Sequence, residues 1–466
     1  MTLLVIWYIQ VFTTVSQTSR PTTDSHTHGV TSRPKTALDN TSPEDLSSAR
    51  APFISWPLRR LCTEQVESRS PVPGLVFLCD NNSGGPGNIR NYILTCVRYA
   101  IEAGATGLQI PRIRTRSTSN KGNLFEEYQP FSYMFSETHF RNAMAEACPH
   151  ISLFPSEGSS GGLDAIPGVA AKAARENLPP ERMVRQITPK EFGGTRGGCD
   201  SRDPNRHTDR FGLAFREWMR GIAADLGLRP TNWENPMLVR LSWGVLWDWP
   251  IIRDGPELAA TFGGLLRIRE DILELADRVA QSMKELATSV AESRSGGDGS
   301  GSNGLFLGVH LRTEEDALSQ WPTYENQSKG YLYKAEKQGF RSGVAYLASG
   351  SEKETRRFGE DARVYLDLTV KSKYDLVHGQ ELKKLKLLSW DQQALVDFVV
   401  LLKSDYFVGV SPSSFSINVA LKRHLQKEGL HTRPWKVGAS DERSWLVGWY
   451  LSYWDDWLFM FDGMWP

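Results

Sequence analysis

A histidine, an arginine and three acids stand close together in the run LFLGVHLRTEED, residues 305–316. The apolar first half of this run is typical of a buried strand, and Arg312 stands just past its end. A guanidinium there can bind a phosphate through two parallel hydrogen bonds, which a lysine cannot do. The alternative is an ion pair between Arg312 and one of the acids at 314–316, with His310 as an ordinary core histidine.

A second candidate is the glycine-rich loop DNNSGGPGN, residues 80–88, between an apolar strand and a helix. Gly84, Gly85 and Gly87 let the main chain approach a ligand closely. The free N–H groups of the helix that begins near Asn88 can bind an anion. A tight turn from strand to helix explains the same residues without any ligand.

The third candidate follows the apolar strand YFVGV, residues 406–410, where Ser413 or Ser414 is expected to cap a helix beside Phe415. Two hydroxyls and the N–H groups of the first helical turn form an anion site that the helix dipole favours. Capping alone, however, needs only one serine. Asp397 interrupts the apolar helix ALVDFVVLL, and a carboxylate there needs a partner.

Alternating strands and helices must position these loops. GLVFLCD, IRNYILTCVRYAIEAG and TGLQIP read as strand, helix and strand, with Gly104 as the helix stop, and such a unit implies a parallel sheet. Further along the chain, LLRIREDILELADRVAQSMKEL is typical of a long amphipathic helix.

The second half of the chain alternates in the same way. Strands are predicted at LFLGVHL, GVAYLAS, RVYLDL and YFVGV, and helices around residues 331–339, 352–358, 391–402 and 414–424. The predicted fold class is α/β, with two doubly wound, Rossmann-like sheets facing each other across a cleft. Because ligands bind beyond the carboxyl ends of parallel strands, the loops after Leu78, Leu311 and Val410 should converge on that cleft.

Composition suggests further divisions along the 466 residues, a length that exceeds one compact core. Residues 1–20 are predicted to be a secretory signal or short anchor, since their apolar run is too short to span a bilayer. Residues 21–51 read as a disordered stem rich in Ser, Thr and Pro. An N-terminal Rossmann-like part (52–290), a Gly/Ser linker or loop (291–304) and a C-terminal part (305–466) follow. The tryptophan-rich tail is expected to pack back across both parts, or alternatively to bind a sugar by stacking.

Charge and cysteine content limit the partners. The 54 basic and 54 acidic residues cancel, which argues against nucleic acid and against general attraction to anionic membranes, so a membrane is expected only through an N-terminal anchor. The five cysteines form no CxxC pair, and in a lumenal protein two disulfides with one free thiol are natural; five buried thiols are the alternative. Sequons at Asn40, Asn81 and Asn326 are compatible with a lumenal or secreted protein.

In this order, the motifs GGPGN (84–88), HLRTEED (310–316) and DYFVGVSPSSF (405–415) resemble those of the protein O-fucosyltransferase superfamily, including its plant branch and fungal relatives. The run IRNYILTCVRYAIEAGATGLQIPRI looks like the first helix and second strand of that family. The resemblance implies a GT-B fold with an acceptor-side N-terminal part and a C-terminal part that binds GDP-fucose. It also implies an inverting glycosyltransferase of the secretory pathway, in the ER or Golgi lumen or secreted.

The resemblance further implies roles for single residues. Arg312 is expected to contact the diphosphate of the donor, with His310 beside it, and Asn88 to lie near the reacting centre. Arg312 and Asn88 are therefore the predicted catalytic residues. The predicted donor-binding residues are Gly85, Gly87, His310, Arg312, Asp397, Ser413, Ser414 and Phe415.

Two departures from the family pattern matter. The arginine often found second in the glycine loop is Gly85 here, and Arg90 is the candidate replacement for the missing cation. Some members carry a glutamate base where this chain has Asn88, so no carboxylate base is carried over. With no Asp-x-Asp triplet at a strand end, no metal cofactor is expected, and a cation and helix amides must stabilise the leaving diphosphate.

The acceptor, a protein or a glycan, is not identified by any motif. Three alternatives remain open: a transferase that uses another nucleotide sugar, a non-catalytic member that binds a nucleotide or glycan, and a structural lumenal protein.

Overall fold

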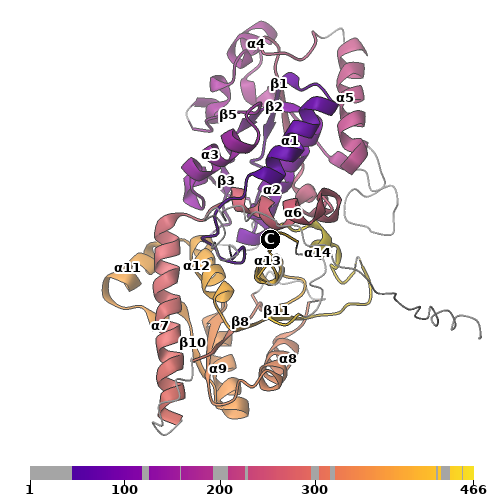
Figure 1. Cartoon of the computed structure of the whole chain (residues 1–466). Coiled ribbons are helices and arrows are strands. Elements are labelled where there is room, and N and C mark those ends of the chain that lie inside the picture. The colour runs from indigo at the N-terminus through magenta and orange to yellow at the C-terminus, as the bar shows by residue number, and fades with distance from the viewer. Residues whose placement is uncertain are drawn as a thin grey trace, which may run out of the picture. The chain divides into compact units, whose positions relative to one another are not determined.

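Each half of the chain builds a five-stranded parallel sheet (Figure 1). The computed structural model describes residues 45–117, 125–157, 159–192, 208–225, 229–294, 304–314, 321–426, 429–431, 441–453 and 455–466. Residues 43–466 form one compact unit. The predicted signal and most of the stem therefore lie outside the described residues.

The first sheet has the strand order β5-β2-β1-β7-β6. Its strands are β1 (Val72–Leu78), β2 (Ala105–Gln109), β5 (Ser152–Phe154), β6 (Val184–Ile187) and β7 (Met237–Leu241). The helices that accompany it are α1 (Trp56–Ser68), α2 (Pro86–Ala103), α3 (Glu137–Ala147), α4 (Val169–Glu176), α5 (Thr208–Asp225) and α6 (Gly255–Thr261). A small antiparallel pair, β3 (Ile113–Arg114) and β4 (Tyr128–Gln129), follows β2.

The second sheet has the order β10-β9-β8-β11-β12. Its strands are β8 (Phe306–His310), β9 (Val344–Ala348), β10 (Thr369–Lys371), β11 (Tyr406–Val410) and β12 (Ser444–Val447). Its helices are α8 (Tyr324–Lys337), α9 (Glu352–Leu366), α10 (Lys373–Leu376), α11 (Gly379–Leu387), α12 (Trp390–Leu402) and α13 (Ser414–His424). In both sheets the chain reverses its direction of winding beside the first strand, which is where open α/β sheets bind ligands. The α/β prediction is confirmed.

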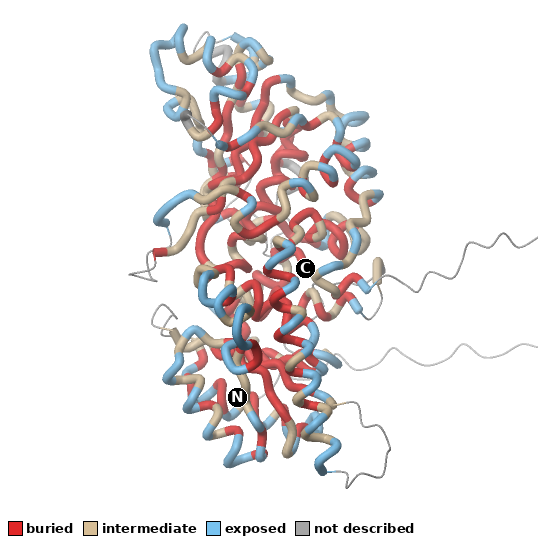
Figure 2. Tube along the Cα trace, turned by 90° about the vertical axis from the view of Figure 1, so that its left-hand side faces the viewer, coloured by how far each residue is buried: buried red, intermediate tan, exposed pale blue. Residues whose placement is uncertain are grey.

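The long helix α7 (Glu270–Arg294) packs against α12, β8 and β9 of the second sheet, although it precedes the predicted linker. The last helix, α14 (Phe459–Gly463), returns to the first half and contacts the 3₁₀ turn η5 (Trp243–Trp247) as well as α13. A continuous buried core follows from these crossings, and Figure 2 shows buried segments running from one half into the other. Residues 295–303, most of the predicted linker, lie outside the described residues.

One predicted strand is wrong. RVYLDL forms the end of α9 instead, and the strand β10 begins only at Thr369. Phe358, Ala362 and Leu366 are buried at a spacing of four residues, so the helical period continues through the segment. Its Val and Tyr residues, whose type suits a strand, are exposed on the opposite face of the helix.

Two disulfides stabilise the first half, as expected for a lumenal protein. Cys62 of α1 is bonded to Cys148, just past α3, and Cys79 at the end of β1 is bonded to Cys96 of α2. Cys199 lies outside the described residues. No helix in the described ranges is long and apolar enough to cross a membrane.

Candidate active site

The starts of α2 and α13, one from each half, meet directly. Gly87 lies so close to α13 that an added Cβ would be 2.9 Å from the carbonyl carbon of Ser414 and 3.1 Å from the nitrogen of Phe415. The glycine loop and the Ser-Ser-Phe turn, predicted separately from sequence, are therefore neighbours in space. Figure 1 shows α13 between the two sheets, below α2.

The glycine loop leaves room beside its second glycine. Gly84 has a φ of +98°, which only glycine adopts readily, and an added Cβ there would be 2.8 Å from the Asn88 amide nitrogen. At Gly85 an added Cβ would meet nothing within 4 Å. The amide oxygen of Asn88 is buried and accepts no hydrogen bond within the described structure. An unpaired buried acceptor is unusual and indicates that a donor group is expected at this point.

His310 is held against the start of α13. Its Nδ1 shares a 2.6 Å hydrogen bond with the Ser416 hydroxyl, which also accepts from the Val410 N–H at 3.1 Å. The imidazole ring lies 4.6 Å from the Phe415 ring, centre to centre. Burial lowers the pKa of His310 to about 4, so the ring is neutral at physiological pH.

The main chain of Arg312 is fixed by Gln327. The Gln327 amide accepts from the Arg312 N–H at 3.0 Å and donates to the Arg312 carbonyl at 2.8 Å. The guanidinium donates to Glu314 and lies 5.7 Å from the Trp321 ring centre. Burial by itself would raise the pKa of Glu314, but the charge of Arg312 outweighs it and the pKa is lowered. The ion pair foreseen as an alternative is thus present, with Glu314, while Glu315 and Asp316 lie outside the described residues.

Asp397 has two donors inside the second half. Its carboxylate accepts from the Tyr346 hydroxyl at 2.6 Å and from the Lys373 ammonium at 2.6 Å, and all three side chains are buried. These partners explain why a carboxylate is tolerated in an apolar helix. A donor-binding role for Asp397 would require it to serve a ligand as well, and stays a prediction.

Ser413 caps α13, since its hydroxyl accepts from the Ser416 N–H at 3.5 Å. Ser414 and Phe415 are the first two residues of the helix and have N–H groups without an intrahelical acceptor. Neither α2 nor α13 carries an acidic residue in its first turn. Two positive helix ends thus meet without a negative side chain from either helix between them, which is the electrostatic setting of an anion site.

Arg90 does not replace the missing loop arginine. Its guanidinium donates to the main-chain oxygens of Trp465 and Pro466, each at 2.5 Å, and burial lowers its pKa to about 10. Asn91 and Asn418 also hydrogen-bond to the main chain of Trp465, from α2 and α13 respectively. The tail therefore packs across both halves, as predicted. It accepts the hydrogen bonds of the Arg90 guanidinium, the group that the sequence suggested as the replacement cation.

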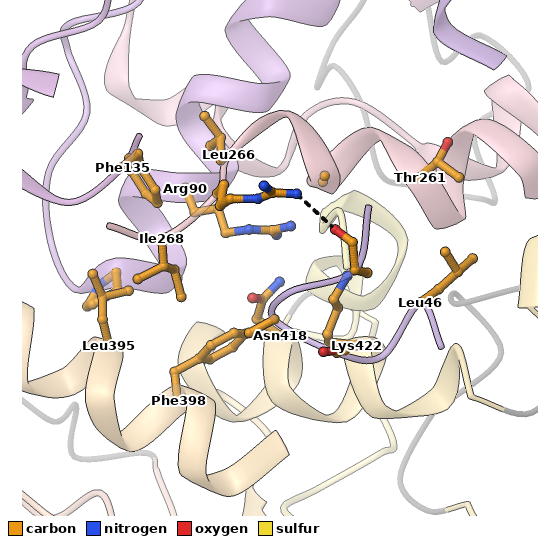
Figure 3. A pocket seen from close by; sticks show the side chains of 18 of the residues that line it. Leu46, Arg90, Phe135, Thr261, Leu266, Ile268, Leu395, Phe398, Asn418 and Lys422 are labelled. Atoms are coloured by element: carbon orange, nitrogen blue, oxygen red, sulfur yellow. Dashed lines mark hydrogen bonds between the residues drawn. The ribbon is translucent and has the colours of Figure 1, made fainter. Parts of the chain in front are cut away.

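A small cavity of about 60 Å³ lies beside this junction (Figure 3). Arg90, Phe398, Asn418 and Lys422 line it, together with the segment that begins at Leu46. Ligand pockets usually measure about 300–1,000 Å³, so this cavity is too small for a nucleotide sugar. Burial lowers the pKa of Lys422, to about 7.

Sequence reasoning missed a second group of charges at the first sheet. Asp80, the first residue after the disulfide-bonded Cys79, accepts hydrogen bonds from Arg240 at 2.7 and 2.8 Å and from Arg112 at 3.1 Å. The alternation of arginines in PRIRTR, directly after β2, was the available signal. The described residues contain no group of three His, Cys, Asp or Glu side chains that could hold a metal ion.

Residues 258–426 match the sequence model of the family described as GDP-fucose protein O-fucosyltransferase. The matched span contains the HLR and Ser-Ser-Phe motifs and supports the resemblance seen in the sequence. No curated protein matches the chain closely enough to count as a relative.

Several solved structures have a similar arrangement. POFUT1 in complex with GDP is 11% identical, with a TM-score of 0.43 and coverage of 80% of this chain and 99% of that chain. The POFUT1 apo form is 13% identical, with a TM-score of 0.42 and coverage of 77% and 96%. The fucosyltransferase NodZ from Bradyrhizobium is 13% identical, with a TM-score of 0.36 and coverage of 76% and 94%. Likenesses this distant do not assign a substrate or a residue.

Proposed function

We propose that this chain, which carries an O-fucosyltransferase domain and is a glycosyltransferase of that superfamily, transfers fucose from GDP-fucose to a hydroxyl of an acceptor protein. The donor and the protein acceptor are those that the description of the matched family names. Inversion at the sugar carbon and independence of metal ions belong to the same proposal.

The observation that supports it most is the meeting of two helix starts from opposite halves at Gly87 and Ser414. Two helix ends of the same sign repel each other at such a short distance, and an anion bound beside both starts offsets the repulsion. A diphosphate carries the required charge and can accept hydrogen bonds from both sets of N–H groups. GDP-fucose supplies that diphosphate.

Arg312 would supply the cation for the leaving group. When the bond between the sugar carbon and the phosphate oxygen breaks, negative charge grows on the diphosphate, and a fixed guanidinium with helix N–H groups stabilises it. Arg312 stands two residues beyond His310, the last residue of β8, and His310 is hydrogen-bonded to Ser416 of α13. The guanidinium of Arg312 is paired with Glu314, so donor binding requires Arg312 to share or exchange this partner.

Asn88 and His310 would act on the sugar and the acceptor. The unpaired amide oxygen of Asn88 can accept a hydrogen bond from the attacking hydroxyl and orient it, but an amide cannot remove the proton. A neutral His310 keeps one ring N–H as a donor while adding no charge beside the sugar. No side chain is assigned here as the base.

The proposed place of action is the secretory pathway. Two disulfides form and persist in an oxidising compartment, and both are built into the half that carries the glycine loop. The family resemblance and the predicted signal in residues 1–20 point the same way.

The test is titration calorimetry with GDP, GDP-fucose and UDP on the wild type and on Arg312→Ala. Arg312→Ala is expected to weaken GDP binding at least about tenfold, because it removes a charge-assisted contact. Arg341→Ala is the matched control, since it removes another arginine paired with a glutamate, on the exposed surface of the same half. Unchanged GDP affinity in Arg312→Ala would mean that Arg312 only forms the ion pair with Glu314 and does not bind the donor. Tighter binding of UDP than of GDP would refute the donor assignment.

A second candidate function is a binding protein without transferase activity. Gly85 in place of a loop arginine, and Asn88 in place of a glutamate base, favour it, because these positions serve catalysis and Arg90 is bonded to the tail instead. Binding of GDP-fucose with no release of GDP or fucose over many hours, with or without acceptor peptides, would decide for this candidate.

A further inference from the structure

Three guanidinium groups and one carboxylate lie close to the Tyr128 ring at the edge of the first sheet. Arg112 and Arg240 both bond to the buried Asp80, with side chains about one quarter exposed (23% and 25%). Arg114 contacts the rings of Phe125 and Tyr128, at 4.9 and 5.2 Å from their centres, and pairs with no carboxylate in the described structure. Three positive charges against one negative charge leave a local excess of two.

The buried charges are only partly satisfied. The Nε atoms of Arg112 and Arg114 are buried and have no hydrogen-bond partner in the described part of the chain. Glu126 and Glu127, the nearest acids on the β3–β4 ribbon, are exposed and form no ion pair with either arginine. These Nε atoms are out of reach of a ligand, but the guanidinium groups are partly exposed, and their excess positive charge is suited to bind an incoming carboxylate.

This cluster is attached to the glycine loop. The Asn82 amide of that loop donates to the Arg112 carbonyl at 2.7 Å and accepts from the Arg114 N–H at 3.1 Å. Asp80 opens the same loop, and Trp243 contacts it through the Ser83 carbonyl at 3.5 Å. Whatever binds to the arginines therefore lies beside the proposed donor site, on the side of the first sheet.

We propose that Arg112 and Arg114, with Arg240, form an acceptor subsite that binds carboxylate side chains next to the reacting hydroxyl of an acidic peptide. The proposal rests on the proposed function, because it names the acceptor class of that site. Arg112 and Arg114 are alternate residues of an extended segment, so they lie on one face about 6.6 Å apart along the chain. In an extended peptide, acidic side chains at every second position also lie on one face with this spacing, so they can pair with the two arginines.

The aromatic rings of the cluster favour a peptide over a sugar chain. Sugars stack on open aromatic faces, whereas Arg112 lies over the Tyr128 ring at 4.1 Å and Arg114 lies over Phe125. Phe125 also contacts Trp243 edge to face, at 6.1 Å between centres. With these faces occupied, the guanidinium groups are the groups that a ligand meets, and they recognise charge and hydrogen-bond acceptors.

The test uses a short fluorescein-labelled peptide with a central threonine and aspartate at every second position, and a twin with asparagine in place of each aspartate. Fluorescence anisotropy is measured on the full chain with saturating GDP at low and at physiological salt. The aspartate peptide is expected to bind at least about fivefold more tightly than its twin, and added salt should reduce the difference. Arg114→Gln should remove most of that preference, and Arg114→Lys should keep part of it because the charge remains.

Arg356→Gln is the matched control, since it removes an exposed arginine on α9 and should leave peptide binding unchanged. Equal binding of the two peptides, or an unchanged preference in Arg114→Gln, overturns the proposal. An acidic oligosaccharide that competes as well as the aspartate peptide also overturns it, because the subsite would then not be selective for peptide. GDP binding measured on the same samples separates this from the proposed function: failure of GDP to bind the wild type refutes the function, whereas normal GDP binding with no aspartate preference refutes the subsite alone.

Discussion

The contact between the two helix starts can be tested by adding one methyl group. In Gly87→Ala the new Cβ would lie 2.9 Å from the Ser414 carbonyl carbon and 3.0 Å from its oxygen. Carbon atoms in contact prefer about 3.5–4.0 Å, so the helix starts must separate by about 0.5–1 Å. Main-chain atoms form the obstacle, and a change of side-chain rotamer cannot relieve it.

The expected energies follow from that overlap. Overpacking of a close contact costs about 1–3 kcal/mol, and the better helix propensity of alanine returns at most about 1 kcal/mol. The free energy of unfolding should therefore fall by about 1–2 kcal/mol. Transfer should fall more steeply, since a displacement of about 1 Å at a reacting centre can cost about 10²-fold in rate.

Gly85→Ala provides the control within the same loop. Its Cβ would meet nothing within 4 Å, and the φ of −78° at this position suits alanine. Urea unfolding of both variants, followed by circular dichroism, should show a lower midpoint for Gly87→Ala and an unchanged midpoint for Gly85→Ala. Calorimetry should then show weaker GDP binding in Gly87→Ala. If both variants unfold at the wild-type urea concentration and Gly87→Ala binds GDP normally, the two helix starts are not in contact and the reasoning is refuted.

Two further measurements test His310 and the Cys79–Cys96 disulfide, which support the elements on either side of the contact between α2 and α13. Because the pKa of His310 is lowered from 6.5 to about 4, the unfolded chain binds more protons than the folded protein between these values, and stability falls as the pH drops through that window. The full effect is about 3 kcal/mol, and urea unfolding should show that His310→Gln loses this slope relative to the wild type. Removal of the Cys79–Cys96 disulfide, which closes a separation of 17 residues, should lower the free energy of unfolding by about 3 kcal/mol and weaken GDP binding, because it joins the strand before the glycine loop to α2. Unaltered GDP affinity in the double Cys→Ala variant would mean that the loop is positioned without it.

Local pattern in the sequence predicted most elements of both sheets. The strand at 406–410 and the helix at 414–424 agree with the structure to the residue, because an apolar run followed by a capping serine is a local signal. RVYLDL failed because residue types that suit a strand competed with a helical period that had begun earlier in the chain. The crossing of α7 to the second sheet could not be read from the sequence, since an amphipathic helix does not specify which surface covers its apolar face.

For the candidate site, the sequence predicted the segments but not the partners of their side chains. It indicated that Asp397 needs a partner, yet Lys373 and Tyr346 are brought to it only by the folded sheet. It suggested Arg90 as the cation for the diphosphate, whereas the Arg90 guanidinium is hydrogen-bonded to the tail, hundreds of residues away. Partners so distant along the chain leave no local pattern, so these assignments required the structure.

Neither half by itself carries all the contacts of the proposed donor site. The first half supplies the glycine loop and the unpaired Asn88, and the second supplies Arg312 and the free N–H groups at Ser414. Each helix start alone offers only part of the hydrogen bonds that a diphosphate can accept, and one helix end is worth about 0.3–1 kcal/mol to an exposed charge. Two ends held at the separation set by Gly87 can act on the same anion, so that their contributions combine. Donor affinity should therefore depend on the spacing between the halves as strongly as on the charge of Arg312.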